Sequence, residues 1–213
     1  SADIFIALGA YSITVVIGLG LMTVLFYPLI IKLFTGYAPT QFLRKISPAQ
    51  LLAFSTSSSA ATLPVTMERV EEHLGVEEEV TSFVCPIGAT INMDGTSLYQ
   101  AIAAVFIAQV FAQDLSLSNQ LTIVITATMA SIGSAAVPGA GILMLIIVLE
   151  SVGVNPAGIG LIFAVDRPLD MLRTVTNVTG DAAVAMLVGS SVGKLNPKIK
   201  PREWDENYEE DKE

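Results

Sequence analysis

Charge is scarce in this sequence. Only 15% of the 213 residues are Asp, Glu, Lys or Arg, whereas 52% are hydrophobic, and the mean hydropathy is +0.63. Soluble domains carry about 25% charged residues, so the composition excludes a soluble globular domain and a disordered chain. The net charge of −9 would repel phosphate backbones, which excludes a nucleic-acid-binding protein.

Cysteine and histidine are almost missing. The single Cys85 excludes a disulfide scaffold and a four-cysteine metal site, and the single His73 excludes a histidine-rich metal site. The serine run at 57–59 has no Gly-x-Ser-x-Gly context, and His73 lies in an acidic stretch away from it. The chain is therefore not expected to be an enzyme.

Long uncharged stretches predict membrane-spanning helices. A spanning helix needs roughly 20 mostly apolar residues, and residues 4–31 meet this requirement without a charge. Further uncharged stretches lie at 95–113, 115–149 and 151–165. The stretch 115–149 is too long for one simple helix and is interrupted by glycine and proline. No basic region followed by an apolar core and a cleavage site opens the chain, so no signal peptide is expected.

The basic residues predict the orientation of these spans. They follow the first span and the last one, at Lys32, Arg44, Lys45, Lys194, Lys198, Lys200 and Arg202. The regions around Asp114 and Glu150 contain no Lys or Arg. By the positive-inside rule, the basic regions are predicted to be cytoplasmic and the other two external. Residues 194–213 are predicted to form a solvated, poorly ordered tail.

Two segments of the chain resemble each other. Residues 54–64 and 130–141 are small, polar and helix-breaking, and each contains Ser-Ala-Ala followed closely by Pro. The apolar arms beside them are too short to cross a bilayer at 1.5 Å per residue. Irregular backbone at membrane depth is tolerated only inside protein or along a cavity, so the pattern predicts two re-entrant hairpins in an inverted repeat. The alternative is that the small residues only allow close helix packing.

A polar stripe follows one face of the last apolar segment. At 3.6 residues per turn, a sector of roughly 100° contains Asp166, Asp170, Arg173, Thr174, Asn177 and Asp181. Charges inside a membrane persist where they face a partner, an ion or a polar substrate. The Arg173 guanidinium suits a carboxylate and Asp170 suits an ammonium group. Asn177 and Asp181 offer oxygen ligands for Na⁺. The alternative is an internal Asp170–Arg173 ion pair without a ligand, and Arg167 is expected to pair locally or to reach the interface.

A short polar motif interrupts the apolar segment 80–113. The motif is Asn-Met-Asp-Gly-Thr at 92–96, and Asn, Asp and Gly are poor helix formers. A break here would leave backbone carbonyls free for a cation, with Asp94 adding a charge and Asn92 and Thr96 adding neutral oxygens. The alternative is a simple kink in which Asp94 caps the second half of the helix.

Four motifs together resemble the dicarboxylate/amino acid:cation symporter family, which includes the excitatory amino acid transporters and archaeal sodium/aspartate symporters. They are the motif at 92–96, the serine run at 57–59, the Val-Pro-Gly-Ala-Gly segment at 137–141 and the stripe at 166–181. The resemblance runs from the first span, which looks like the sixth helix of the family, to about Val192. The family's earlier helices have no counterpart here, so the chain is expected to be the C-terminal half of such a transporter, a homotrimer when full length.

The resemblance implies an all-α membrane protein with a transport-domain core at 47–193. The implied parts are one preceding transmembrane helix with a cytoplasmic linker (1–46), a first re-entrant hairpin (about 47–75), a broken helix (about 80–113), a second, inverted hairpin (about 117–152), a polar-striped helix (about 156–192) and a charged cytoplasmic tail (194–213).

The resemblance also implies roles for individual residues. The implied substrate contacts are Ser58, Ser59, Thr96, Ala135, Ala136, Val137, Gly141, Asp170, Arg173, Thr174 and Asn177. The implied sodium ligands are Gly88, Asn92, Asn177 and Asp181 at one site, Thr90, Ser131, Ile132 and Ser134 at a second, and Asn92 and Asp94 in part of a third. The sequence departs from the family at 60–61 and at Ala136, where alanine stands in place of a frequent glycine. Neither change removes a charged group.

The implied function is Na⁺-coupled symport of an acidic amino acid, aspartate or glutamate, by alternating access. Asp170 argues against a dicarboxylate without an amino group, and Arg173 argues against a neutral amino acid. The implied partners are the substrate, sodium ions, the lipid bilayer and the missing N-terminal helices, in a multi-pass protein of the plasma or inner membrane with a cytoplasmic C-terminus. The alternatives are proton-coupled symport of the same substrates, an ion-conducting channel and, third, a purely structural membrane module.

Overall fold

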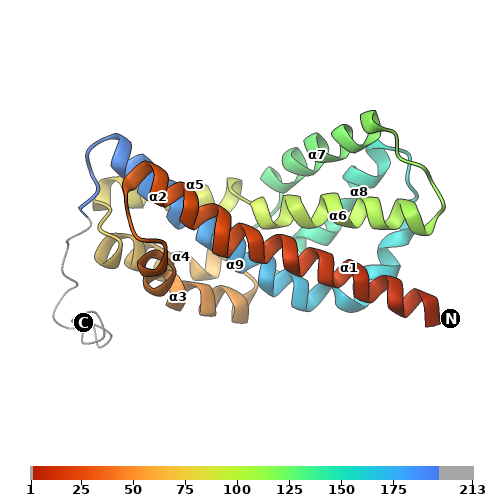
Figure 1. Ribbon diagram of the computed structural model, residues 1–213, viewed down its shortest axis with the longest axis horizontal. Helices are drawn as coiled ribbons and strands as arrows, with labels where there is room; N and C mark the ends of the chain where they lie inside the picture. Colours follow the sequence, from red (N-terminus) through yellow and green to blue (C-terminus); the bar gives the residue numbers. More distant parts are fainter. Residues whose placement is uncertain (1, 197–213) are drawn as a thin grey trace.

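The computed structural model describes residues 2–196, and these residues are almost entirely helical (Figure 1). The elements, in chain order, are α1 (Ala2–Leu21), the π-helical turn η1 (Met22–Phe26), α2 (Tyr27–Thr35), α3 (Pro39–Thr56), α4 (Ser59–Glu68), the π-helical turn η2 (Arg69–His73), α5 (Glu78–Ile91), α6 (Asp94–Val110), α7 (Leu117–Ile132), α8 (Ala140–Ser151), the 3₁₀-helix η3 (Pro156–Gly158) and α9 (Ile159–Ser191). The prediction of an all-α protein is confirmed for the described part, where the β-structure is one isolated bridge between Val76 and Leu195.

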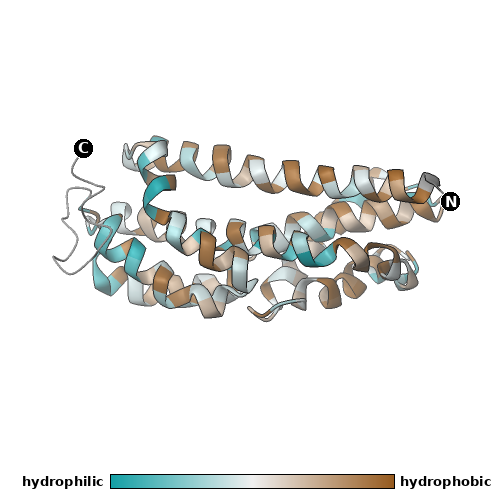
Figure 2. Ribbon diagram, turned by 90° about the horizontal axis from the view of Figure 1, so that it is seen from below, coloured by the Kyte–Doolittle hydropathy of each residue, from teal (hydrophilic) through white to brown (hydrophobic). Residues whose placement is uncertain are grey.

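The first three elements form one long apolar helix. Over Ile4–Thr35 it has 32 residues and, among the residues described, is the one helix long and apolar enough to cross a membrane by length and composition. Only 22% of its most apolar window is buried. Figure 2 shows hydrophobic residues along its whole length. Its exposed side chains, among them Phe5, Leu25 and Phe34, suit a hydrocarbon surrounding.

Two antiparallel helix pairs approach the centre of the molecule from opposite ends (Figure 1). The first pair is α3 with α4, and the second is α7 with α8. Their tips touch, because the Ser58 hydroxyl donates a hydrogen bond to the Ala136 carbonyl at 2.7 Å. The second pair has 16 and 12 residues in its arms, which gives lengths of about 24 and 18 Å. Both are shorter than the roughly 30 Å core of a bilayer.

The first arm of the first hairpin is longer than expected. α3 begins at Pro39, so residues 39–46, which the sequence suggested as a linker, form its first turns. Proline at the start of a helix is favourable because its missing N–H has no intrahelical partner there.

The interrupted helix lies beside the two tips. α5 ends at Ile91 and α6 begins at Asp94, and Asn92 and Met93 have non-helical backbone between them. α9 packs along α3, α5 and α6, which brings its polar stripe against the break. The helix break therefore faces buried protein, where irregular backbone is tolerated.

Two apolar cores flank this polar centre. One joins α1, α6, α7, α8 and the first half of α9, and the other joins α2, α3, α5 and the second half of α9. Their fully buried side chains include Tyr99, Ile107, Leu145 and Ile162 in the first core, and Phe42, Ile46, Leu74 and Met186 in the second. Burial of these side chains holds α9 in place on both sides of the stripe.

The residues that follow α9 are bonded to the base of the first hairpin. The Glu77 N–H donates to the Lys194 carbonyl at 3.1 Å, and the Asn196 N–H donates to the Gly75 carbonyl at 2.6 Å. Glu79 accepts a hydrogen bond from the Lys194 ammonium group, and this bond raises the pKa of Lys194. The predicted tail thus begins with ordered residues, and its remainder, 197–213, lies outside the described part of the chain.

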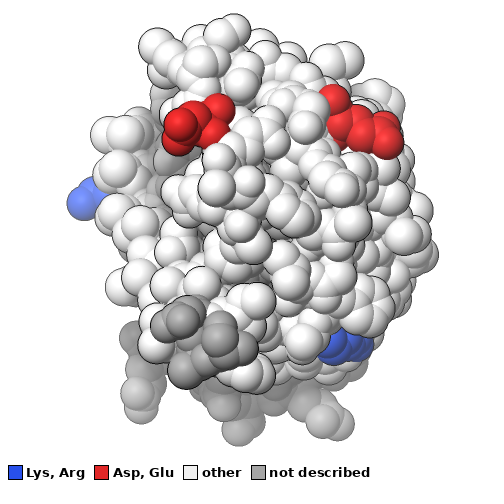
Figure 3. Space-filling view, turned by 90° about the vertical axis from the view of Figure 1, so that its right-hand side faces the viewer, with Lys and Arg blue, Asp and Glu red and all other residues white. Residues whose placement is uncertain are grey.

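Charged residues are unevenly distributed between the two ends of the molecule. The sequence contains no Lys or Arg between Arg69 and Arg167. The end formed by the α6–α7 and α8–α9 connections is mostly uncharged, with a few acidic and basic side chains (Figure 3). Lys32 lies in the last turn of α2 and Lys194 follows α9, and both of these helices end at the opposite end of the molecule (Figure 1).

Candidate functional site

The two hairpin tips, the helix break and α9 enclose a small cavity. Its lining includes Ser57, Ser59, Met93, Thr96, Ser134, Ala135, Ala136, Val137, Gly141, Asp170, Thr174 and Asn177. All of the predicted substrate contacts except Ser58 and Arg173 therefore line it. The cavity encloses about 20 Å³, which is the space of about one water molecule. An amino acid can enter only if one of the walls moves.

Two helices begin at this cavity. α4 begins at Ser59, and its N-cap Ser58 accepts a hydrogen bond from the Ala61 N–H at 3.1 Å. α8 begins at Ala140, directly after Gly139, whose φ of 77° places it in the left-handed region. Helix N-termini present unpaired N–H groups and partial positive charge. Both tips consequently favour an anionic group between them.

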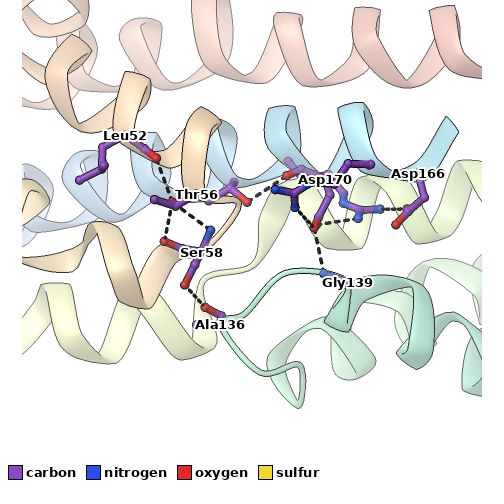
Figure 4. Close-up of polar contacts among 10 residues, drawn as sticks. Leu52, Thr56, Ser58, Ala136, Gly139, Asp166 and Asp170 are labelled. Carbon is purple, nitrogen blue, oxygen red and sulfur yellow. Dashed lines mark hydrogen bonds and ion pairs between the residues drawn. The ribbon is translucent and has the colours of Figure 1, made fainter.

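Arg173 is the charged centre of the site. Its side chain is 1% exposed, and it donates from Nη1 to Asp166 at 3.0 Å and from Nη2 to Asp170 at 2.7 Å (Figure 4). The Tyr99 ring lies 3.7 Å from the guanidinium carbon. The internal Asp170–Arg173 pair that the sequence left open is thus present, and Asp166 is a second partner. A buried guanidinium requires such partners, because an unpaired charge in the interior is costly.

Asp170 connects Arg173 to the second hairpin. Its Oδ1 accepts from Arg173, and its Oδ2 accepts from the Gly139 N–H at 2.9 Å (Figure 4). Arg167, with an exposed side chain, lies 3.8 Å from the same Oδ2, which agrees with the local pairing expected for it. One carboxylate therefore bonds both the arginine and the tip that covers it.

Asn177 connects the stripe to the helix break. Its Oδ1 accepts from the Gly95 N–H at 2.8 Å, and its Nδ2 lies 3.3 Å from Thr96 Oγ1 and 3.2 Å from Met93 Sδ. The side chain thus bonds the first residues of α6. The contact fixes the break against α9 and keeps oxygen atoms together at this point.

Three residues of the first predicted sodium site, Gly88, Asn92 and Asp181, lie together, whereas the fourth, Asn177, bonds the start of α6. Asp181 is 2% exposed and its Oδ1 accepts from Asn92 Nδ2 at 3.1 Å. Gly88 packs directly on this carboxylate, because a Cβ there would lie 2.6 Å from Oδ1. Residues 2–196 contain no group of three His, Cys, Asp or Glu side chains arranged for a metal. A cation here would therefore rely on one carboxylate with amide and backbone oxygens, a donor set that suits Na⁺ better than a transition metal.

The residues of the second predicted sodium site are divided between surface and interior. Ser131 and Ser134 are buried, whereas Thr90 and Ile132 are exposed. α5 ends at Ile91 and α7 ends at Ile132, and both ends line one groove. Helix C-termini present unpaired carbonyls and partial negative charge. Two such ends beside each other favour a cation.

Asp94 of the third predicted site has a partner that the sequence did not indicate. Its Oδ2 accepts from the Tyr27 hydroxyl at 2.6 Å. The sequence also did not indicate Tyr99, whose ring contacts the Arg173 guanidinium, or Gly139, whose N–H bonds Asp170. Asp166 was recognised only as a member of the stripe. Spacing on one helix could have indicated Asp166, but contacts between distant segments have no such signal.

Comparison with known proteins identifies the family. The model of the sodium:dicarboxylate symporter family matches residues 1–191. Excitatory amino acid transporter 1 of Ambystoma tigrinum is 52% identical over 85% of this chain and 33% of its own length. Excitatory amino acid transporter 4 of Rattus norvegicus is 51% identical over 85% of this chain and 32% of its own length. An excitatory amino acid transporter of Caenorhabditis elegans is 47% identical over 88% of this chain and 37% of its own length.

The chain spans about a third of the length of the curated relatives that it matches. These relatives and the matching family are membrane transporters and not enzymes, as the composition and the absence of a catalytic motif predicted. The family match covers most of the chain, including both hairpins, the helix break and the charged stripe. The chain therefore belongs to the sodium:dicarboxylate symporter family.

Proposed function

We propose that this chain forms the substrate- and cation-binding part of a symporter that carries an acidic amino acid together with Na⁺. The observation that carries the proposal is a buried Arg173, held between Asp166 and Asp170, beside a cavity where two helix N-termini meet. Such a site offers positive charge for two carboxylates and negative charge for one ammonium group, which is the charge pattern of aspartate and glutamate.

Binding proceeds by an exchange of partners at Asp170. The side-chain carboxylate of the substrate takes the place of Asp170 on Arg173, while Asp166 continues to hold Nη1. Asp170 Oδ1 is then available to the substrate ammonium group. The α-carboxylate lies at the helix N-termini that begin at Ser59 and Ala140. Each ion pair that is broken is replaced by another, so the buried charges stay compensated.

Cations make this exchange favourable. Asp94 and Asp181 bring negative charge to the side of the cavity formed by the helix break, and Asn177 of the stripe bonds this break. A Na⁺ ion held by Asp181, Asn92 and backbone carbonyls neutralises that charge and fixes the break. Ions and substrate are coupled because both stabilise the same closed arrangement. The family is described as a sodium:dicarboxylate symporter family, and the relatives are named excitatory amino acid transporters. Both names support this proposal.

Transport then requires alternating access. The second tip withdraws to admit the substrate, closes over it, and the loaded core moves relative to the remaining helices of the longer protein. The cavity of about 20 Å³ is the reason that a wall must move. No covalent step is involved.

Calorimetric titration of the full chain with L-aspartate, with and without Na⁺, tests the proposal. Saturable binding is expected in Na⁺ and weak binding in choline, and succinate, which lacks the ammonium group, should bind much more weakly than aspartate. Binding that is equal in both salts, with uptake driven by a pH gradient, would instead favour proton coupling. Absence of saturable binding in both salts would contradict the acidic amino acid as substrate.

A further inference from the structure

The first long helix contains a π-helical turn at the level of the helix break. The Tyr27 N–H donates to the Met22 carbonyl, five residues earlier, instead of the usual four. Pro28 follows directly and has no N–H for the regular ladder. A π-turn inserts one extra residue, which rotates everything after it by about 100° relative to a continuous α-helix.

This rotation determines where Tyr27 lies. The side chain is 4% exposed, and its hydroxyl donates to Asp94 Oδ2 at 2.6 Å. One turn earlier, the Thr23 hydroxyl lies 3.0 Å from the Thr176 hydroxyl of α9. The Tyr27 contact joins the turn to the helix break, and the Thr23 contact joins it to a residue of α9 outside the stripe. A continuous α-helix would carry Tyr27 about 100° away from this position.

Asp94 depends on this contact. Among residues 2–196, the Tyr27 hydroxyl is the one side-chain group that donates to its carboxylate. The carboxylate also lines a groove between α1, α6 and α7, together with Ser97, Thr128 and Ser131. Asp94 is thus held by one oxygen while its side chain remains accessible from the groove, which is the arrangement of a ligand that is fixed before the ion arrives.

We propose that Tyr27, set in place by the π-helical turn, is a positioning residue that orients Asp94 for the coupling cation. The inference rests on the proposed function, because it presumes Na⁺-dependent binding of an acidic amino acid. The hydroxyl acts through Asp94 and does not contact the amino acid, since Tyr27 is not part of the lining of the cavity between the tips. Its loss therefore weakens the response to Na⁺ and leaves the amino acid contacts in place.

The test compares Tyr27→Phe with Thr23→Val in the full chain. Tyr27→Phe removes only the hydroxyl, and Thr23→Val removes the neighbouring interhelical contact without touching Asp94. The readout is the Na⁺ concentration that gives half-maximal binding of radiolabelled L-aspartate. A hydrogen bond to a charged group predicts an increase of about tenfold for Tyr27→Phe. Aspartate affinity at saturating Na⁺ should stay unchanged, and Thr23→Val should behave as the parent protein in both readouts.

A second measurement reads the cation alone. Na⁺ without amino acid should raise the melting temperature of the parent protein, and the Na⁺ concentration needed should rise about tenfold in Tyr27→Phe. An unchanged Na⁺ response in both readouts would overturn the inference, as would an equal loss of aspartate affinity at saturating Na⁺. If the parent protein itself bound aspartate without Na⁺, or bound none, the proposed function would fail first and the inference with it.

Discussion

The two helical hairpins differ most at their tips. In the first, Ser57 and Ser58 alone separate α3 from α4, and both are buried. In the second, residues 133–139 separate α7 from α8, and Val137 is 54% exposed. A short buried tip has few conformations available, whereas a long exposed one costs little to reopen. In the proposed mechanism, the first tip is therefore expected to be a fixed wall and the second to be the part that moves.

The contacts of the two hairpins agree with this division. The first is bonded to α9 through Gln50, which donates to Thr179 at 2.9 Å, and its base is bonded to the residues after α9. The second tip is held by hydrogen bonds to three of its residues. The Ser58 hydroxyl donates to the Ala136 carbonyl, the Gly139 N–H donates to the Asp170 carboxylate, and Gln100 donates to the Gly141 carbonyl at 2.9 Å. The bond to Asp170 is the one that the proposed exchange of partners would alter.

The largest effect is expected for Asp170→Asn. The change removes the charge that pairs with Arg173 and holds the second tip. In the proposed complex the same carboxylate pairs with the substrate ammonium group. Breaking a buried ion pair costs about 3–5 kcal/mol, so aspartate affinity measured by calorimetry should fall by more than roughly 100-fold. Arg167→Gln is the control, because Arg167 touches the same carboxylate from the surface. An affinity of Asp170→Asn within threefold of the parent would contradict the role of Asp170.

A smaller effect is expected for Gly139→Ala. A Cβ at this position meets open space, but φ is 77°, so the cost is conformational, about 1–2 kcal/mol. Affinity should fall by a factor of roughly 5–30, because the closed tip becomes harder to form. Gly153→Ala is the matched control, with φ of 70° and open space but no contact with Asp170. Equal losses of affinity in both variants would show that the effect is not specific to the tip.

Ser58→Ala should have a moderate effect on both stability and affinity. It removes the N-cap of α4 and the bond to Ala136, and loss of a cap costs about 1 kcal/mol. The melting temperature in detergent reports the stability lost with the cap, and the aspartate affinity reports the effect of losing the contact between the tips. Ser116→Ala removes the N-cap of α7 at the far end. If it lowered affinity as much as Ser58→Ala does, the contact between the tips would have no role in closure.

The smallest effect is expected at the base of the first hairpin. Lys194 is partly exposed and pairs with Glu79, which raises the pKa of the ammonium group above its ordinary value of 10.5. The contribution to stability is therefore present below this pH and disappears as the pH rises beyond it. Lys194→Gln should lower the melting temperature less than Ser58→Ala does, with unchanged affinity. A loss of affinity would mean that this base is not part of a fixed wall.

Much of the fold was predictable because its signals are local. The motif Asn-Met-Asp-Gly-Thr predicts a helix break, and the break lies at Asn92 and Met93. The helical period predicts a polar stripe on α9, and the residues of this stripe are buried. The family resemblance was confirmed by the family match, whereas the roles of single residues in binding stay predictions.

The remaining features depend on distant segments. Spacing alone could not decide whether Arg173 pairs with Asp170, with Asp166 or with a ligand, since both carboxylates lie on the same face. The contact between Tyr27 and Asp94 joins residues 67 positions apart. Pro28 lacks the N–H of a regular helix, but its position alone does not specify the π-turn that precedes it. The length of α3 was underestimated because Lys and Arg near its start resemble a loop.

Hydrogen exchange at the two tips tests the central claim most directly. Exchange of the backbone amides would be followed in the full chain, first alone and then with L-aspartate and Na⁺ together. The account predicts that amides of residues 134–141 become strongly protected, while amides of residues 57–61 are protected from the start and change little. Strong new protection in the first tip with none in the second, or no change in either, would contradict it.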